Sequence, residues 1–172
     1  RQMCIRDSFK IQDNIQMNTG EIGCFLSHFN VWNKIIEFSH SFALILEDDV
    51  TFNTNFNYYL NKITNDLNMN EIDIIMLASF RLNEDDNVEY YNNYLNYYIT
   101  STNAHSYILT IRGAKKLMKL NCINNMLPVD DYFAYINLNY NFTILSVVSD
   151  LCNQEYREFF PSNIIDKPIV ET

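Results

Sequence analysis

Three consecutive carboxylates, Glu47, Asp48 and Asp49, form the segment of this 172-residue chain whose chemistry is most distinctive. Adjacent carboxylates repel one another, so placing this acidic triplet directly after an apolar segment is costly unless something neutralises it. A hard divalent cation such as Mn²⁺ or Mg²⁺ would do so through oxygen ligands. Such a cation could hold a nucleotide diphosphate and stabilise it as a leaving group. The alternative is an acidic loop that simply faces water.

A second acidic pair, Asp130 and Asp131, follows Pro128 at the expected start of a short helix. The proline would fix the loop geometry, because its φ is preset for the first helical turn. A carboxylate held there could act as a general base that takes the proton of a hydroxyl group, or it could help to hold the metal. The alternative is that Asp130 caps the helix.

Three further residues are candidates for contacts with a bound cofactor or substrate: His28, Arg81 and His105. His28 lies close to the apolar stripe of an expected helix, where a buried, hydrogen-bonded histidine is the simpler interpretation. His105 belongs to an expected strand and could line a ligand site or could be packed in the ordinary way. Arg81 follows another expected strand and could contact a phosphate or a sugar, although most loop arginines are simply solvated.

The elements that would position these residues follow from apolar spacing. Asn18 or Thr19 can cap a helix, and the apolar residues that follow predict a helix over residues 20–38, with Trp32 on its core side. A continuous apolar run at residues 42–46 is typical of a strand covered on both faces, as in a parallel sheet. This strand ends at the acidic triplet, and the carboxyl ends of strands are where open α/β sheets bind ligands.

The rest of the chain alternates between strand and helix patterns. The further expected elements are helices at 55–67, 113–120 and from Val129, strands at 72–78, 104–110 and 142–148, and a polar loop at 83–96. Lys115, Lys116 and Lys119 are most simply the solvated face of the second of these helices. The alternation predicts an α/β domain with a mainly parallel sheet.

Composition narrows the function further. Hydrophobic residues make up 48% of the chain and only three residues are glycine, so a folded single domain is expected. The net charge of −9 argues against nucleic-acid binding, which depends on Lys and Arg. No stretch is long and apolar enough to form a transmembrane segment. The four widely spaced cysteines favour free buried thiols over a zinc site, with a disulfide as the alternative.

Four segments of the chain together resemble glycosyltransferase family 25, the lipopolysaccharide-type and procollagen galactosyltransferases. These segments are GEIGCFLSH at 20–28 with Trp32, ALILEDDV at 43–50, AHSYILT at 104–110 with GAKKL at 113–117, and MLPVDDY at 126–132. Their order and approximate spacing also match, which is far more specific than an acidic triplet alone. The first and last segments are more similar to the animal procollagen branch than to the bacterial one.

The resemblance implies an α/β fold of the GT-A-like (Rossmann-like) type, a UDP-galactose donor, a Mn²⁺ or Mg²⁺ ion and inversion at the anomeric carbon. By the same resemblance the acidic triplet is the metal-binding motif, with Asp49 as the first choice of ligand and Glu47 as the second. His28 would then border the donor pocket. The implied acceptor is a hydroxyl group, either on hydroxylysine in a collagen-like chain or on a sugar of a glycan or lipopolysaccharide. The compartment would be the cytoplasm for a bacterial or viral protein and the endoplasmic reticulum lumen for a procollagen-type enzyme.

Two departures from the family pattern qualify these expectations. Residues 1–17 do not resemble the strand and arginine-bearing segment with which family members normally begin, so we expect one transferase domain over 18–172 that lacks its N-terminal strand. From about Asn137 onward the match is weak, and a histidine carried there by animal relatives is missing. The alternative to an enzyme is therefore a non-catalytic binding or adhesion protein with the same fold. A metal-dependent hydrolase is disfavoured, because the sequence lacks a histidine-rich metal shell.

Overall fold

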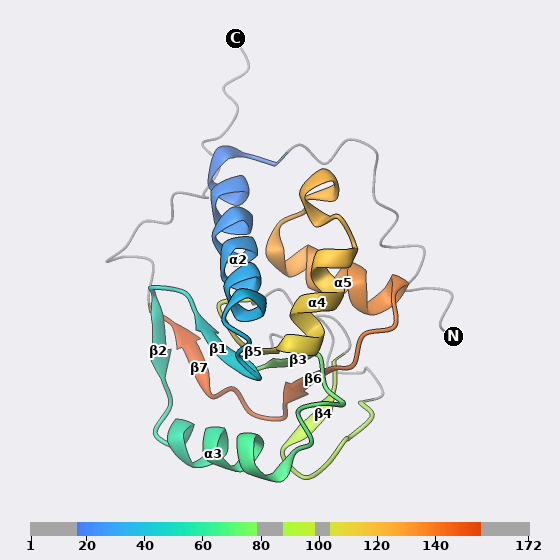
Figure 1. Cartoon of the computed structure of the whole chain (residues 1–172). Coiled ribbons are helices and arrows are strands. Elements are labelled where there is room, and N and C mark those ends of the chain that lie inside the picture. Colours follow the sequence, from blue (N-terminus) through green and yellow to red (C-terminus); the bar gives the residue numbers. More distant parts are fainter. Residues whose placement is uncertain (1–16, 79–87, 99–103, 156–172) are drawn as a thin grey trace.

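A five-stranded sheet with helices on both faces forms the centre of the structure (Figure 1). The structure is a computed structural model and describes residues 17–78, 88–98 and 104–155. The strands of the sheet, in spatial order, are β1 (Phe42–Leu46), β5 (Ser106–Thr110), β3 (Ile74–Met76), β6 (Ile144–Val147) and β4 (Leu95–Tyr97). Two further strands, β2 (Val50–Phe52) and β7 (Cys152–Gln154), pair with each other in a separate small sheet. The predicted α/β class is confirmed.

The helices divide the core into two layers. Helices α2 (Thr19–Glu37), α4 (Ile111–Lys119) and α5 (Val129–Asn139) lie on one face of the sheet, and α3 (Phe56–Asp66) lies on the other (Figure 1). A short 3₁₀ helix (Cys122–Asn125) follows α4. Because side chains alternate along a strand, Ile74 packs with Trp32 in the layer that holds α2, whereas Ile75 packs with Ile63 of α3. None of the described helices is long and apolar enough to cross a bilayer.

Helix α2 begins with a capping box. The Asn18 side chain accepts from the Glu21 backbone N–H at 2.9 Å, and the Glu21 carboxylate accepts from the Asn18 N–H at 2.8 Å. The buried residues of the helix are spaced along one face: Phe25, His28, Trp32 and Ile35. Both the predicted helix over 20–38 and the buried position of Trp32 are confirmed.

The expectation of a mainly parallel sheet is wrong. Only the pairing of β3 with β6 is parallel among the described strands, and β1–β5, β3–β5 and β4–β6 are antiparallel. The interpretation of β1 as a strand covered on both faces is also wrong, since the side chains on one of its faces are exposed and the strand lies at the edge of the sheet. Its residues Phe42, Leu44 and Leu46 are exposed on one face of the strand. They alternate with Ala43 and Ile45, which face the α2 layer. A five-residue apolar run does not by itself distinguish an edge strand from a central one.

Helix α4 carries a buried ion-pair cluster that corrects one further expectation. Asp73, just before β3, is fully buried, and its carboxylate lies 2.6 Å from Lys116 Nζ and 3.2 Å from Arg112 Nε. The Thr143 N–H donates to the same carboxylate at 2.7 Å. Lys116 is therefore half-buried and paired, because its long apolar stem allows the ammonium to reach Asp73. Its neighbours on the predicted solvated face, Lys115 and Lys119, are exposed as expected.

Candidate functional site

The acidic triplet follows β1 directly, at the end of the strand where β5 begins. The Glu47 N–H donates to the His105 carbonyl at 2.8 Å, and the Leu77 N–H donates to the Ser106 carbonyl at 3.1 Å. The carboxyl ends of β1 and β3 therefore lie on either side of the start of β5, since β5 is antiparallel to both. This arrangement brings Glu47 and His105 next to each other, although 58 positions separate them in the sequence.

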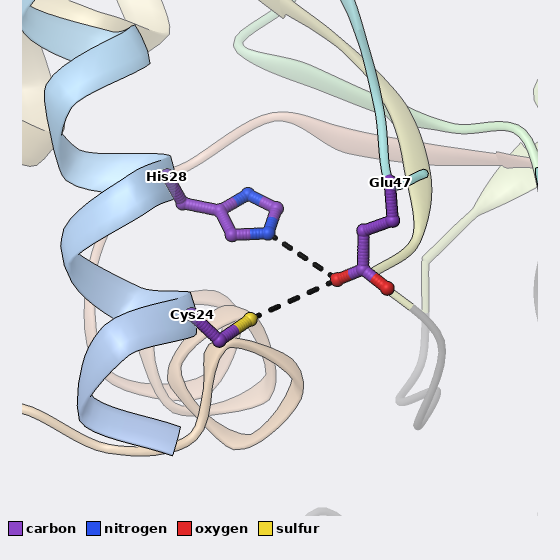
Figure 2. Close-up of side chains that lie close together, drawn as sticks. All are labelled: Cys24, His28 and Glu47. Atoms are coloured by element: carbon purple, nitrogen blue, oxygen red, sulfur yellow. Dashed lines mark hydrogen bonds and ion pairs between the residues drawn. The ribbon is translucent and has the colours of Figure 1, made fainter. Parts of the chain in front are cut away.

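The Glu47 carboxylate is turned toward helix α2 (Figure 2). Its Oε1 lies 3.3 Å from Nε2 of His28 and 3.8 Å from Sγ of Cys24. Cys24 and His28 are four residues apart, so they lie one turn from each other on the same helical face. The hydrogen bond from His28 lowers the pKa of Glu47, against the opposing effect of burial. Glu47 therefore carries its negative charge at neutral pH.

His28 is itself oriented by a buried hydrogen-bond chain. Its Nδ1 lies 2.7 Å from the Tyr107 hydroxyl, which accepts from Trp32 Nε1 at 2.8 Å. An indole N–H can only donate, so the Tyr107 proton is free to go to His28 Nδ1. His28 then carries its own proton on Nε2 and donates it to Glu47. The interpretation of His28 as a buried, hydrogen-bonded histidine is confirmed, and its place beside a donor pocket stays a prediction.

Cys24 is a thiol in this arrangement and not a thiolate. Burial, followed by the negative charge of Glu47, raises the pKa of Cys24 to about 12. A protonated thiol can donate weakly to the Glu47 carboxylate. Within the described residues the cysteines are free, as expected, and Cys122 and Cys152 are buried.

Asp49 points away from α2, toward the small β2–β7 sheet. Its backbone carbonyl accepts from the Glu155 N–H at 2.7 Å, and its Oδ2 lies 3.4 Å from Nε2 of Gln154. Its other oxygen, Oδ1, is buried and has no hydrogen-bond partner in the part of the chain that the structure describes. Asp48, between the two, is exposed. The three carboxylates thus diverge: one faces α2, one faces solvent, and one is half-buried beside β7.

His105 also has buried side-chain atoms without a hydrogen-bond partner. Its side chain is 3% exposed, and neither ring nitrogen makes a hydrogen bond within the described residues, although the Cys152 backbone is close enough to raise its pKa. Burial nonetheless lowers the pKa of His105 overall, while the nearby carboxylates of Glu47, Asp49 and Asp150 oppose that change. Buried polar atoms are nearly always paired, so unpaired ones point to a missing water, ion or ligand.

Asp130 reaches the same region from α5. Its Oδ1 accepts from the Ala104 N–H at 2.7 Å, just before β5. Burial, together with the charges of Glu47 and Asp131, raises the pKa of Asp130 from 3.8 to about 7, against the lowering effect of the hydrogen bond from the Ala104 N–H. The cap of α5 is Pro128, so helix capping does not explain Asp130. For the neighbouring Asp131, burial and the charge of Glu21 also raise the pKa.

Comparison with known proteins now identifies the family. The sequence model of glycosyltransferase family 25 (LPS biosynthesis protein) matches residues 2–133. The chain belongs to glycosyltransferase family 25. The family match begins at residue 2, so it extends further toward the N-terminus than the motifs that begin at Gly20. It ends at residue 133, inside α5 and just after Asp130 and Asp131.

Relatives within family 25 match about two thirds of the chain. A "glycosyltransferase 25 family member" of Anopheles gambiae is 33% identical over 120 residues, and procollagen galactosyltransferase 1-B of Xenopus laevis is 32% identical over 120 residues. A mouse protein named inactive glycosyltransferase 25 family member 3 is 29% identical over 121 residues. Each match covers 67% of this chain and 20% of the relative, so the matched region spans about a fifth of the length of these family 25 proteins.

The structure brings together four of the eight predicted site residues and adds two that the sequence did not single out. Glu47, His28, His105 and Asp130 meet at one end of the sheet, and Arg81 lies outside the described residues. The two additions are Cys24 and Tyr107, and both lie in segments that resemble family 25. The four-residue spacing of Cys24 and His28 could have indicated their shared face. The contact of Tyr107 with His28 depends on the fold alone.

Proposed function

We propose that the chain is the catalytic part of a metal-dependent, inverting glycosyltransferase that moves galactose from UDP-galactose to a hydroxyl acceptor. Membership of family 25 supports a glycosyltransferase. The single observation that carries the metal-dependent site is the buried Asp49 Oδ1, which has no partner among the described residues and lies at the carboxyl end of β1. A cation is the partner that best suits a buried, unpaired carboxylate oxygen.

The acidic triplet would hold Mn²⁺, or Mg²⁺, principally through Asp49. Asp48 lies in the same turn as Asp49 and is exposed, so it is accessible to an ion. Glu47 Oε1 is hydrogen-bonded to His28, so Glu47 would be a secondary ligand of this ion after Asp49. The fit rests on oxygen ligands, which hard divalent cations prefer. When bound, the ion would neutralise the diphosphate and so stabilise UDP as the leaving group.

Asp130 is the proposed general base. Its pKa of about 7 places it where both protonation states are accessible near neutral pH, as a base in this reaction requires. The hydrogen bond from the Ala104 N–H fixes one of its oxygens and leaves the other for the acceptor hydroxyl. A single displacement with inversion needs only one such carboxylate. Asp131 is half-buried on the same helical turn and is the alternative base.

Of the remaining predicted residues, His105 and Arg81 would contact the donor. Burial lowers the pKa of His105 and favours the neutral ring. A neutral imidazole can donate one hydrogen bond and accept another from a sugar or a phosphate. His28 would act from behind Glu47, by orienting that carboxylate. Arg81 remains the proposed phosphate contact, on sequence grounds alone.

The proposed acceptor is hydroxylysine in a collagen-like chain or a sugar of a glycan or lipopolysaccharide. The name of the Xenopus relative, a procollagen galactosyltransferase, favours the first. The name of the mouse relative, an inactive family member, favours a second candidate function, a binding protein that kept the fold without turnover. Binding of UDP-galactose without transfer or hydrolysis would distinguish this candidate from the enzyme.

Galactose transfer to a hydroxylysine-containing collagen-like peptide, measured as UDP release with Mn²⁺, tests the proposal. Asp49→Ala should lower the rate by more than about 100-fold, because even loss of outer-shell partners of a metal costs about 10–100-fold. Glu37→Gln, which removes an exposed charge on α2, should leave the rate unchanged. Full activity in Asp49→Ala would contradict the proposed metal site.

A further inference from the structure

The side chains of Cys24, His28 and Glu47 converge on one point between α2 and the end of β1 (Figure 2). Each offers one ligand atom, and the three atoms lie within 4.8 Å of one another. The Nε2 of His28 is 3.3 Å from Glu47 Oε1, and Sγ of Cys24 is 3.8 Å from the same oxygen. Among the described residues this is the one group of three or more His, Cys, Asp or Glu side chains with such spacing.

The two separations that involve Glu47 Oε1 are close to those of a tetrahedral zinc site. With bonds of about 2.0 Å to nitrogen and oxygen and about 2.3 Å to sulfur, neighbouring ligand atoms stand about 3.3 to 3.6 Å apart. The Cys24–Glu47 and His28–Glu47 contacts differ from these values by no more than a few tenths of an ångström. We propose that Cys24, His28 and Glu47 form a Zn²⁺ site that is separate from the Asp49 site. Small rotations of side chains would complete it.

The ligand types select zinc over the hard cations of the acidic triplet. A thiolate and an imidazole are the ligands that Zn²⁺ prefers, whereas Mn²⁺ and Mg²⁺ prefer carboxylate and water oxygens. Three protein ligands leave the fourth tetrahedral position open to water or another ligand. The contacts of Glu47 Oε1 assign that oxygen to the zinc ligands, and Asp49 remains the principal ligand of the diphosphate-binding ion.

Binding of zinc requires two proton changes, and the surrounding residues provide for one of them. The Cys24 thiol releases its proton to solvent when sulfur binds the ion. His28 moves its proton from Nε2 to Nδ1, and Nδ1 then donates a hydrogen bond to the Tyr107 hydroxyl oxygen, 2.7 Å away. Tyr107 then accepts from both His28 and Trp32, and its hydroxyl orients the imidazole in the way that outer-shell partners of zinc ligands do.

The zinc site does not depend on the transferase proposal, and it can be tested without substrate. Co²⁺ is a suitable probe, because a tetrahedral Co²⁺ ion bound to a thiolate shows an intense sulfur-to-cobalt absorption band. Titration of the folded chain with Co²⁺ should produce this band with one ion per chain, and added Zn²⁺ should abolish it. Mn²⁺ at the same concentration should not.

Variants assign the band to these residues. Cys24→Ser should abolish it and His28→Gln should weaken Co²⁺ binding by at least about tenfold, in samples whose circular dichroism matches that of the parent chain. Cys4→Ser and the buried Cys122→Ser should retain the band, as should Asp49→Ala. Absence of the band from the folded parent chain, or its persistence in Cys24→Ser, would overturn the zinc site. Neither result would bear on UDP binding at Asp49.

Discussion

The Tyr107 hydroxyl on β5 lies 2.7 Å from Nδ1 of His28 on α2, and the two rings stack at 5.7 Å between centroids. This contact joins helix α2 to the second strand of the sheet, 79 positions away in the sequence. It also decides which nitrogen of His28 faces Glu47. The fold and the candidate site therefore share one buried hydrogen-bond chain.

Replacing Tyr107 with Phe removes the hydroxyl and keeps the ring. Trp32 Nε1 and His28 Nδ1 would then be buried without their partner, and each such group costs about 1–3 kcal/mol. We expect the free energy of unfolding to fall by about 2–4 kcal/mol in urea denaturation. Tyr58→Phe, at a tyrosine that is 63% exposed, should change it by less than about 0.5 kcal/mol. Equal stability of the two variants would argue against a stabilising hydrogen-bond chain through Trp32, Tyr107 and His28.

Two glycines should respond in opposite directions to replacement by alanine. A Cβ at Gly113 would stand 2.3 Å from the Asp73 carbonyl oxygen, so α4 would have to move away from β3. We expect Gly113→Ala to destabilise the fold by at least about 1–3 kcal/mol. A Cβ at Gly23 in α2 meets nothing within 4 Å, so Gly23→Ala should stabilise by about 0.5–1 kcal/mol. Thermal unfolding of both variants checks the close packing of α4.

The stability of the chain should depend on pH through Asp130. Its folded pKa of about 7 lies above the ordinary 3.8, so the folded state keeps a proton that the unfolded state releases as pH rises from about 4 to about 7. Stability should therefore fall across that window, by up to about 4 kcal/mol from this group. Asp130→Asn removes the ionisation but keeps an acceptor for the Ala104 N–H. It should be more stable than the parent at pH 8 and similar to it at pH 4.

The same variant tests the catalytic part of Asp130. A general base must be ionised, so the rate of transfer should rise as pH increases through about 7 in the parent chain and be lost in Asp130→Asn. Asp66→Asn, which alters an exposed carboxylate of α3, should keep both the rate and its pH profile. An active Asp130→Asn would leave Asp131 as the base.

His105 should show a gain in stability together with a loss of function. His105→Leu replaces two buried, unpaired ring nitrogens with apolar atoms, and we expect the free energy of unfolding to rise by about 1–2 kcal/mol. The affinity for UDP-galactose should fall at the same time, because His105 is a proposed donor contact. His40→Leu, at an exposed histidine, should do neither. Loss of stability in His105→Leu would mean that the ring has a structural partner.

Much of the fold followed from sequence because its longer elements carry strong patterns. The capping residue Asn18 and the apolar face of α2 predicted that helix to within a residue or two, and the buried strands β3, β5 and β6 were likewise expected. The strands β2, β4 and β7 were not predicted, since three residues are too few to show alternation, and β4 begins inside the expected polar loop at 83–96. The equally short β3 was predicted because it lies within the longer apolar run at 72–78. Strand direction also escaped prediction, because apolar content records burial and not the identity of the neighbouring strand.

The candidate site was predicted in position more than in geometry. The acidic triplet does end β1, as its sequence indicated. That Glu47 and Asp49 face opposite ways could not be read from the sequence, because their partners, His28 and Gln154, come from distant elements. The pairing of Asp130 with Ala104 is of the same kind. The residue types therefore predicted the kind of chemistry at the site, whereas the tertiary contacts that bring particular atoms together could not be predicted from the sequence.

Calorimetric titration of UDP into the chain, with and without Mn²⁺, is the most direct test of the proposed donor site. Binding should appear only with Mn²⁺, should vanish in Asp49→Ala, and should persist in the control Glu37→Gln. Binding that is equally tight without Mn²⁺, or that survives in Asp49→Ala, would contradict a metal-dependent site at the end of β1. Absence of binding in the folded chain under both conditions would contradict donor binding by these residues.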